Sequence, residues 1–172
     1  MPSQPGLRPT ADRVRETLFN WLQPVIAGAR CLDLFAGSGA LGFEAASRGA
    51  AEVVMVERSE PVARLLEANA ATLGASRVRV HRADALRWLA RAGEPFDIVF
   101  LDPPFDKRLL GPSCDLLCRN GWLVTRGLIY LEAAANPGFP DLPVDWVLTR
   151  NKKAGQVRYA LASVNDGGIA SA

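Results

Sequence analysis

Short runs of apolar residues alternate along this chain with segments in which apolar residues recur every three or four positions. The first pattern is typical of buried strands and the second of amphipathic helices. We therefore expect strands over residues 30–35, 53–57, 78–81, 96–101 and 128–132. We expect helices over residues 10–22, 40–48, 59–73, 83–91 and 109–119, with Thr10 capping the first and Ser59 the third.

This alternation predicts an α/β fold of the Rossmann-like type, a mostly parallel sheet with helices on both faces. Residues 146–150 and 157–161 flank a turn at Gly155, which predicts an antiparallel hairpin at the C-terminal end. We expect one domain over residues 10–164, an irregular lead-in at 1–9 and a frayed tail at 165–172.

Composition excludes several classes of protein. The 172 residues are 49% hydrophobic and 22% charged, which is ordinary for a soluble globular domain. No stretch approaches the roughly 20 apolar residues of a membrane helix, and the N-terminus lacks a secretion signal. Three cysteines and a single histidine favour reduced thiols in the cytoplasm over a disulfide framework or a metal site.

A glycine-rich turn follows the first expected strand. Gly37-Ser38-Gly39-Ala40-Leu41-Gly42 matches the GxGxxG fingerprint of dinucleotide-binding folds in its strand–turn–helix context. Glu57 ends the next strand, where its carboxylate can accept hydrogen bonds from ribose hydroxyls. The plainer interpretation is a tight turn beside a surface carboxylate, but the order of strand, turn, helix and acid favours a cofactor site.

The fingerprint alone leaves a nicotinamide cofactor and S-adenosyl-L-methionine open. Asp33 favours the second, because a carboxylate before the turn repels a pyrophosphate but suits the cationic amino group of a methionine moiety. The chain is also short for a dehydrogenase with a separate substrate domain. Asp84 follows the third strand, where it can receive an adenine amino group, cap the next helix, or do both.

A carboxylate, two prolines and an aromatic ring follow the fourth strand, as Asp102-Pro103-Pro104-Phe105. An exocyclic amine is hard to methylate because its lone pair is delocalised into the base. A carboxylate and a backbone carbonyl that accept its two N–H groups would direct that lone pair toward a methyl donor. The prolines supply a rigid backbone without competing donors, and Phe105 can stack on a base. Alternatively, this is a proline turn whose Phe105 covers the core.

Basic residues form three clusters that can contact phosphates or can be solvated surface charge. They are Arg8, Arg13 and Arg15; Lys107 and Arg108; and Arg150, Lys152, Lys153 and Arg158. The net charge of +2 is too small to indicate nucleic-acid binding by itself.

Three segments together resemble one known family. They are Arg8-Pro9-Thr10-Ala11-Asp12-Arg13-Val14-Arg15-Glu16, Leu32-Asp33-Leu34-Phe35-Ala36-Gly37-Ser38-Gly39-Ala40-Leu41-Gly42, and Phe100-Leu101-Asp102-Pro103-Pro104-Phe105. The chain is similar, from about residue 6 to about residue 161, to the RsmD family of class I methyltransferases. These bacterial enzymes use S-adenosyl-L-methionine to methylate N2 of guanine 966 in the 16S rRNA of the small ribosomal subunit.

The resemblance implies roles for individual residues and a seven-stranded sheet. The residues that it implies for the cofactor are Asp33, Phe35, Ala36, Gly37, Ser38, Gly39, Glu57, Asp84 and Ala85. Those that it implies for the guanine are Asp102, Pro103, Pro104 and Phe105, with Arg8, Thr10 and Arg13 at the mouth of the pocket. The basic residues Lys107 and Arg108, which follow this segment, are further candidates for contact with the RNA. Asp102 and the Pro103 carbonyl would orient the amine for in-line displacement, and Asp102 would take the leaving proton or pass it to water.

Members of that family usually begin with a basic, glycine-containing strand pair before the Arg-Pro-Thr motif. This chain starts six residues before Leu7, so we expect that extension to be absent and cofactor binding to be independent of it. We expect a monomer that binds the small ribosomal subunit. Three alternatives remain open: a methyltransferase for adenine N6 or a glutamine amide, a non-catalytic RNA-binding module, and a nicotinamide oxidoreductase.

Overall fold

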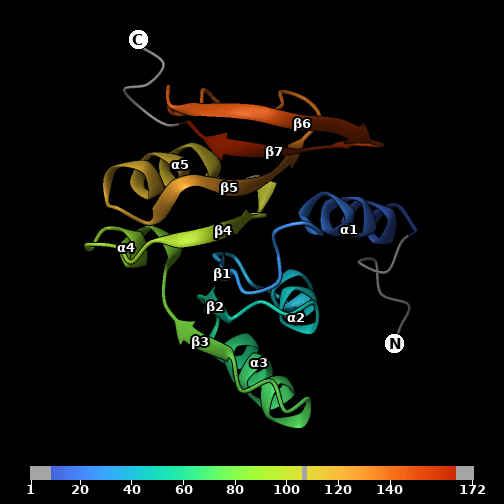
Figure 1. Cartoon of the computed structure of the whole chain (residues 1–172), viewed down its shortest axis with the longest axis vertical. Helices are drawn as coiled ribbons and strands as arrows, with labels where there is room; N and C mark the ends of the chain where they lie inside the picture. The colour runs from blue at the N-terminus through green and yellow to red at the C-terminus, as the bar shows by residue number, and fades with distance from the viewer. Residues whose placement is uncertain (1–8, 106–107, 166–172) are drawn as a thin grey trace.

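The structure is a computed structural model that describes residues 9–105 and 108–165. Its elements, in chain order, are α1 (Pro9–Leu22), β1 (Arg30–Asp33), α2 (Ala40–Ser47), β2 (Glu52–Glu57), α3 (Glu60–Thr72), β3 (Val78–Arg82), α4 (Ala85–Leu89), β4 (Phe96–Leu101), α5 (Leu110–Arg119), β5 (Leu123–Ala134), β6 (Trp146–Ala154) and β7 (Val157–Val164). The described strands form one seven-stranded sheet in the order β3-β2-β1-β4-β5-β7-β6 (Figure 1).

The strand directions confirm the predicted fold class. Strands β1 to β5 pair in parallel, whereas β7 runs antiparallel to both β5 and β6 and closes one edge as a hairpin. The order of strands reverses between β1 and β4, each of which is followed by a turn and a helix. In open sheets of this kind, ligands bind in the crevice at that switch point.

Helices cover both faces of the sheet (Figure 1). Successive residues of a strand point to opposite faces, so each inner strand contributes to two cores. On one face, Cys31, Met55 and Phe100 pack with residues of α1, α2 and α3. On the other face, Leu32 and Val99 pack with residues of α4 and α5. The apolar runs in the sequence are continuous because both faces are buried.

Several expected boundaries were wrong. Helix α1 begins at Pro9, so Thr10 lies inside the first turn and is not its cap; the fixed φ of proline suits the first helical position. Strand β1 ends at Asp33, which leaves Leu34 and Phe35 in the turn. Helix α4 begins at Ala85 and not at residue 83, because Asp84 caps it, and it ends at Leu89.

Strand β5 is longer than residues 128–132, and an irregularity explains the difference. Its pairing with β4 shifts register between Phe96 and Ile98, and Arg126 has a φ of 66° within the strand. Such a bulge interrupts the apolar pattern without ending the strand.

Among the described residues, no helix is long and apolar enough to cross a membrane. Within the same residues, no group of three or more His, Cys, Asp and Glu side chains is arranged to hold a metal ion. The expected lead-in and tail lie almost entirely outside the described residues.

Candidate active site

The glycine turn has the backbone conformation that the fingerprint predicts. Gly37 and Gly39 have φ values of 54° and 83°, in the left-handed region that favours glycine. A Cβ on Gly39 would lie 2.6 Å from Cε2 of Phe43 and 2.8 Å from Cδ2 of Leu66. Close packing and backbone conformation therefore both require glycine at position 39.

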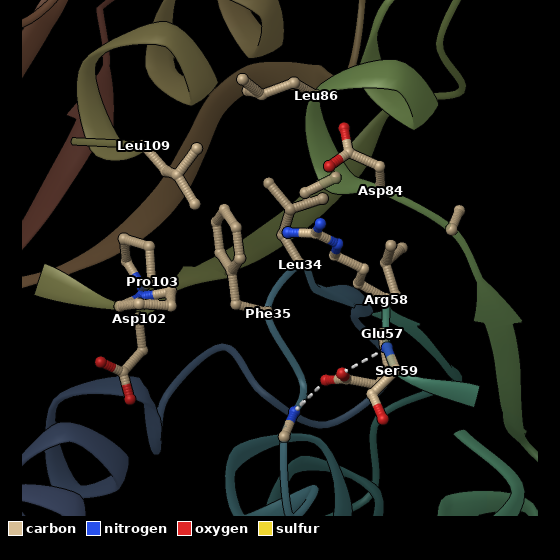
Figure 2. A pocket seen from close by; sticks show the side chains of 15 residues that line it. Leu34, Phe35, Glu57, Arg58, Ser59, Asp84, Leu86, Asp102, Pro103 and Leu109 are labelled. Atoms are coloured by element: carbon tan, nitrogen blue, oxygen red, sulfur yellow. Dashed lines mark hydrogen bonds between the residues drawn. The ribbon is translucent and has the colours of Figure 1, made fainter. Parts of the chain in front are cut away.

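Glu57 lies opposite this turn and holds it in place. Its two carboxylate oxygens accept hydrogen bonds from the backbone N–H groups of Gly37 and Ser59, each at 2.9 Å (Figure 2). Each oxygen has a further lone pair, so Glu57 can still accept from a ligand hydroxyl. The predicted role of Glu57 toward a ribose is thus compatible with a structural role in the same site.

A cavity of about 720 Å³, here the first cavity, lies along the carboxyl ends of β1, β2, β3 and β4. Predicted site residues that line it are Phe35, Gly37, Glu57, Asp84, Ala85, Asp102, Pro103 and Pro104. In Figure 2, Glu57 and Asp84 lie at opposite sides of the cavity, and Phe35, Pro103 and Leu109 form another wall. Mostly apolar walls with a few polar groups are typical of a pocket for a small molecule or cofactor.

Four residues predicted to contact a cofactor are not in that lining: Asp33, Ala36, Ser38 and Gly39. Asp33 is 2% exposed, and its Oδ2 accepts a hydrogen bond of 3.0 Å from the Gly42 amide. Burial raises the pKa of Asp33 to about 7; the hydrogen bond from Gly42 opposes this shift, and the charge of Glu57 adds to it. A carboxylate without a cationic partner here would gain from a nearby ammonium group, so the predicted role of Asp33 stays a prediction.

Asp84 caps helix α4. Its Oδ2 accepts a hydrogen bond of 3.1 Å from the Arg87 amide, and the same residue lines the first cavity. The cap is therefore confirmed, and one carboxylate oxygen is left for a ligand. Arg58 and Leu86 also line the cavity, although the sequence analysis missed them. Each directly follows a predicted site residue, Glu57 or Ala85, and this position in the sequence could have identified them.

The Asp102–Phe105 segment separates the first cavity from two others. A second cavity, of about 530 Å³, is lined by Pro103, Pro104 and Phe105. A third cavity, of about 590 Å³, is lined by Asp102 and Phe105 together with residues of α1, α2 and the β6–β7 hairpin. The Asp102 carboxylate points away from Glu57 and Asp84 (Figure 2), and Phe105 is 45% exposed. Phe105 is therefore available to a ligand and does not merely cover the core.

Asp102 belongs to a cluster of polar side chains whose other members, Tyr130 and Glu132, lie on β5. The Tyr130 hydroxyl donates a hydrogen bond to Oε1 of Glu132, and the Glu132 carboxyl group acts electrostatically on that of Asp102. Asp102 reaches solvent at the cavity mouth, yet the surrounding walls desolvate it. This desolvation, followed by the charge of Glu132, raises the pKa of Asp102 to about 8. Burial also raises the pKa of Glu132.

Of the residues predicted to contact RNA, some lie outside the described residues, one lines a cavity and one does not. Arg8 and Lys107 lie outside the described residues, as does the side chain of Thr10. Arg108 lines the second cavity. Arg13 is exposed and lines none of the three cavities, whereas Arg15 lines the third. Residues two apart lie on opposite sides of a helix, so Arg15 takes the position expected for Arg13.

Comparisons with known proteins agree with this geometry. Residues 1–163 match the model of a family described as conserved hypothetical protein 95. The chain is 53% identical over 161 residues to Ribosomal RNA small subunit methyltransferase D of Escherichia coli strain K12, with 94% of this chain and 81% of that protein covered. It is 46% identical to the protein of the same name in Haemophilus influenzae, with 91% and 82% covered.

A solved structure has the same fold. A putative methyltransferase yhhF from Escherichia coli superimposes with a TM-score of 0.89 at 49% sequence identity. The comparison covers 96% of this chain and 90% of that one. The likeness therefore extends through the sheet, the glycine turn and the hairpin.

Proposed function

We propose a function from one premise: this chain belongs to the RsmD family, as its three sequence motifs indicate. It is an S-adenosyl-L-methionine-dependent methyltransferase that acts on ribosomal RNA. The finer proposal is that it methylates N2 of a guanine in the 16S rRNA of the small ribosomal subunit, at the position equivalent to guanine 966. One observation carries this proposal: Asp102 borders both the first cavity and the third.

The first cavity fits the cofactor. Glu57 has free lone pairs for ribose hydroxyls, and Asp84 with Ala85 can receive the adenine. The Asp33 carboxylate would attract the methionine ammonium group. That positive charge would in turn favour the ionised form of Asp33, which burial otherwise opposes. When bound, S-adenosyl-L-methionine supplies an electrophilic methyl group. The residues of the chain orient the amine and accept its proton.

Asp102 and the Pro103 carbonyl would accept the two N–H groups of the guanine amine. The N2 lone pair is then directed toward the first cavity and is less delocalised into the ring. Phe105, at the border of the second and third cavities, would stack on the base once it leaves its own stack. As the new bond to N2 forms, the amine becomes more acidic, and Asp102 accepts the proton that leaves.

Exposed cations near the third cavity would hold the RNA. Arg15 lines that cavity, and Arg150, Lys152 and Lys153 are exposed along β6 of the adjoining hairpin. Such contacts position phosphates without reading sequence. We propose that the protein acts as a monomer in the cytoplasm, on the assembled or assembling small subunit.

The test uses small subunits that lack the modification. They are incubated with the full chain and radiolabelled cofactor, and the labelled nucleotide in 16S rRNA is mapped by primer extension. We expect label at one guanine, with large subunits unlabelled. Label at another base or in a ribosomal protein would contradict the proposal, and the Asp102→Ala variant controls for a contaminating activity.

A further inference from the structure

Tyr130 and Glu132 form a polar pair on β5 that the proposed mechanism does not yet use. They are two residues apart in a strand, so their side chains lie on the same face. The register of β4 with β5 pairs Phe100 with Tyr130 and Leu101 with Leu131, which brings Asp102 beside Glu132. All three, Asp102, Tyr130 and Glu132, line the third cavity.

The hydrogen bonds of this group set the direction of its donors and acceptors. Tyr130 is 1% exposed, and burial raises its pKa far above the ordinary value, so the hydroxyl keeps its proton and donates to Glu132. The neighbouring carboxyl groups of Glu132 and Asp102 are both desolvated, and the charge of Glu132 also raises the pKa of Asp102, so ionisation of both groups at once is disfavoured. Among the ion pairs between described residues, none neutralises either group.

A ligand with two adjacent N–H donors can therefore stabilise both carboxylates together by donating one hydrogen bond to each. Neutral guanine presents such an edge, since N1–H lies directly beside the N2 amine. Adenine presents an amine beside an unprotonated N1, and a glutamine amide presents an amine beside a carbonyl oxygen. Both would place a lone pair against the second carboxylate, which is costly in a partly desolvated site.

We propose that Glu132 is the specificity-determining residue of the site: its carboxylate accepts the N1–H of guanine while Asp102 holds the N2 amine. Tyr130 is a positioning residue that occupies one oxygen of Glu132 and turns the other toward the base. This inference rests on the proposed function and extends it, because it explains from the chain's own residues why guanine is selected over adenine or an amide.

The experiment compares guanine with 2-aminopurine, which keeps the N2 amine but has an acceptor at N1. Small subunits are reconstituted with 16S rRNA that carries either base at the target position. In Glu132→Gln, the hydroxyl of Tyr130 holds the amide oxygen, so the amide N–H₂ faces N1. We expect kcat/KM for guanine to fall by about 10- to 100-fold and the preference over 2-aminopurine to fall by a similar factor or reverse.

Two further variants complete the design. Glu94→Gln removes an exposed carboxylate that lines none of the three cavities and should leave both rates unchanged. Tyr130→Phe keeps the Glu132 carboxylate but removes the hydroxyl that orients it. The decrease in kcat/KM for guanine should therefore be smaller than in Glu132→Gln. Calorimetric cofactor affinity and the melting temperature show whether each variant is folded, and Glu132 is not in the lining of the first cavity.

The outcomes separate the two proposals. If folded Glu132→Gln keeps its preference for guanine, or loses activity on both bases equally, Glu132 does not read N1 and the inference is overturned. If the wild-type product is anything other than N2-methylguanine, the proposed function fails first and the inference fails with it.

Discussion

At the scale of single residues, the account depends on the ionisation of Asp102. Only its carboxylate form can accept the leaving proton, yet desolvation and the charge of Glu132 raise its pKa to about 8. The free enzyme therefore holds Asp102 mostly protonated below that pH. We expect kcat/KM to rise with pH up to about 8 and then to level off, since this parameter reports the free enzyme.

Asp102→Asn removes that titration while keeping the shape of the side chain. An amide oxygen can accept one N–H but cannot accept the leaving proton, so we expect kcat to fall about 10²- to 10⁴-fold. The part of the pH profile that belongs to Asp102 should disappear. Wild-type rates in this variant, measured at saturating cofactor, would refute the role of Asp102.

Asp33 links stability to pH in a direction that can be measured. Its pKa is raised from 3.8 to about 7 on folding, so between those values the folded state binds a proton that the unfolded state has released. Stability from this group therefore falls as pH rises from about 4 to 7, and the loss is complete above 7.

We expect Asp33→Asn to be more stable than the wild type at pH 8.5, by at least about 2 °C in melting temperature. The difference should shrink toward pH 4, and cofactor affinity should weaken because the ammonium group loses its counter-charge. Asp141→Asn, at an exposed carboxylate, is the matched control. Equal melting temperatures for Asp33→Asn and wild type across this range would show that burial of Asp33 costs nothing.

The residues that could be predicted from sequence share a simple signal. Glu57 ends an apolar run and Asp102 directly follows one, while Asp84 lies two residues after the end of β3; parallel strands bring such positions to one edge. The group of Tyr130, Glu132 and Asp102 could not be found in this way. It depends on how β5 pairs with β4 across a bulge, and local sequence does not predict that register.

At the scale of elements, helix α2 and its glycine turn position the first cavity. Gly39→Ala adds a clash with Phe43 and Leu66 to a strained φ of 83°. We expect it to lower the free energy of unfolding by about 2–4 kcal/mol, from overpacking plus left-handed strain, and to weaken cofactor binding.

Gly74→Ala is the matched control for that substitution. Gly74 has a φ of 66°, but an added Cβ meets nothing within 4 Å, so only the conformational strain remains. Its destabilisation should be about 1 kcal/mol by urea unfolding. If the two variants lose equal stability, close packing of α2 on α3 is not what requires glycine at position 39.

At the scale of the whole molecule, the two edges of the sheet differ in what they offer RNA. Strand β6, at one edge, belongs to the hairpin whose turn lines the third cavity, and it exposes Lys152 and Lys153. At the other edge lie α3 and β3, with exposed Arg64 and Arg79 in ion pairs (Figure 1). The sequence showed Lys152 and Lys153 only as part of a basic cluster, whereas the fold places them on the hairpin whose turn lines the third cavity.

We expect the double substitution of Lys152 and Lys153 to alanine to weaken binding to 16S rRNA uniformly and to reduce the salt slope by about 1–2. Substitution of Arg64 and Arg79 with alanine removes the same amount of charge and should have little effect on the affinity for 16S rRNA. A salt titration of RNA affinity measures both variants, and equal losses would mean that net charge, not the hairpin, attracts the RNA.

The most direct test of the central claim is the identity of the methylated nucleoside. Small subunits that lack the modification are treated with the full chain and methyl-labelled cofactor, and the 16S rRNA and the ribosomal proteins are digested separately and analysed by mass spectrometry. The label should appear in N2-methylguanosine and nowhere else. Label in N6-methyladenosine or in a glutamine residue, or no transfer by protein that binds the cofactor, would contradict the account.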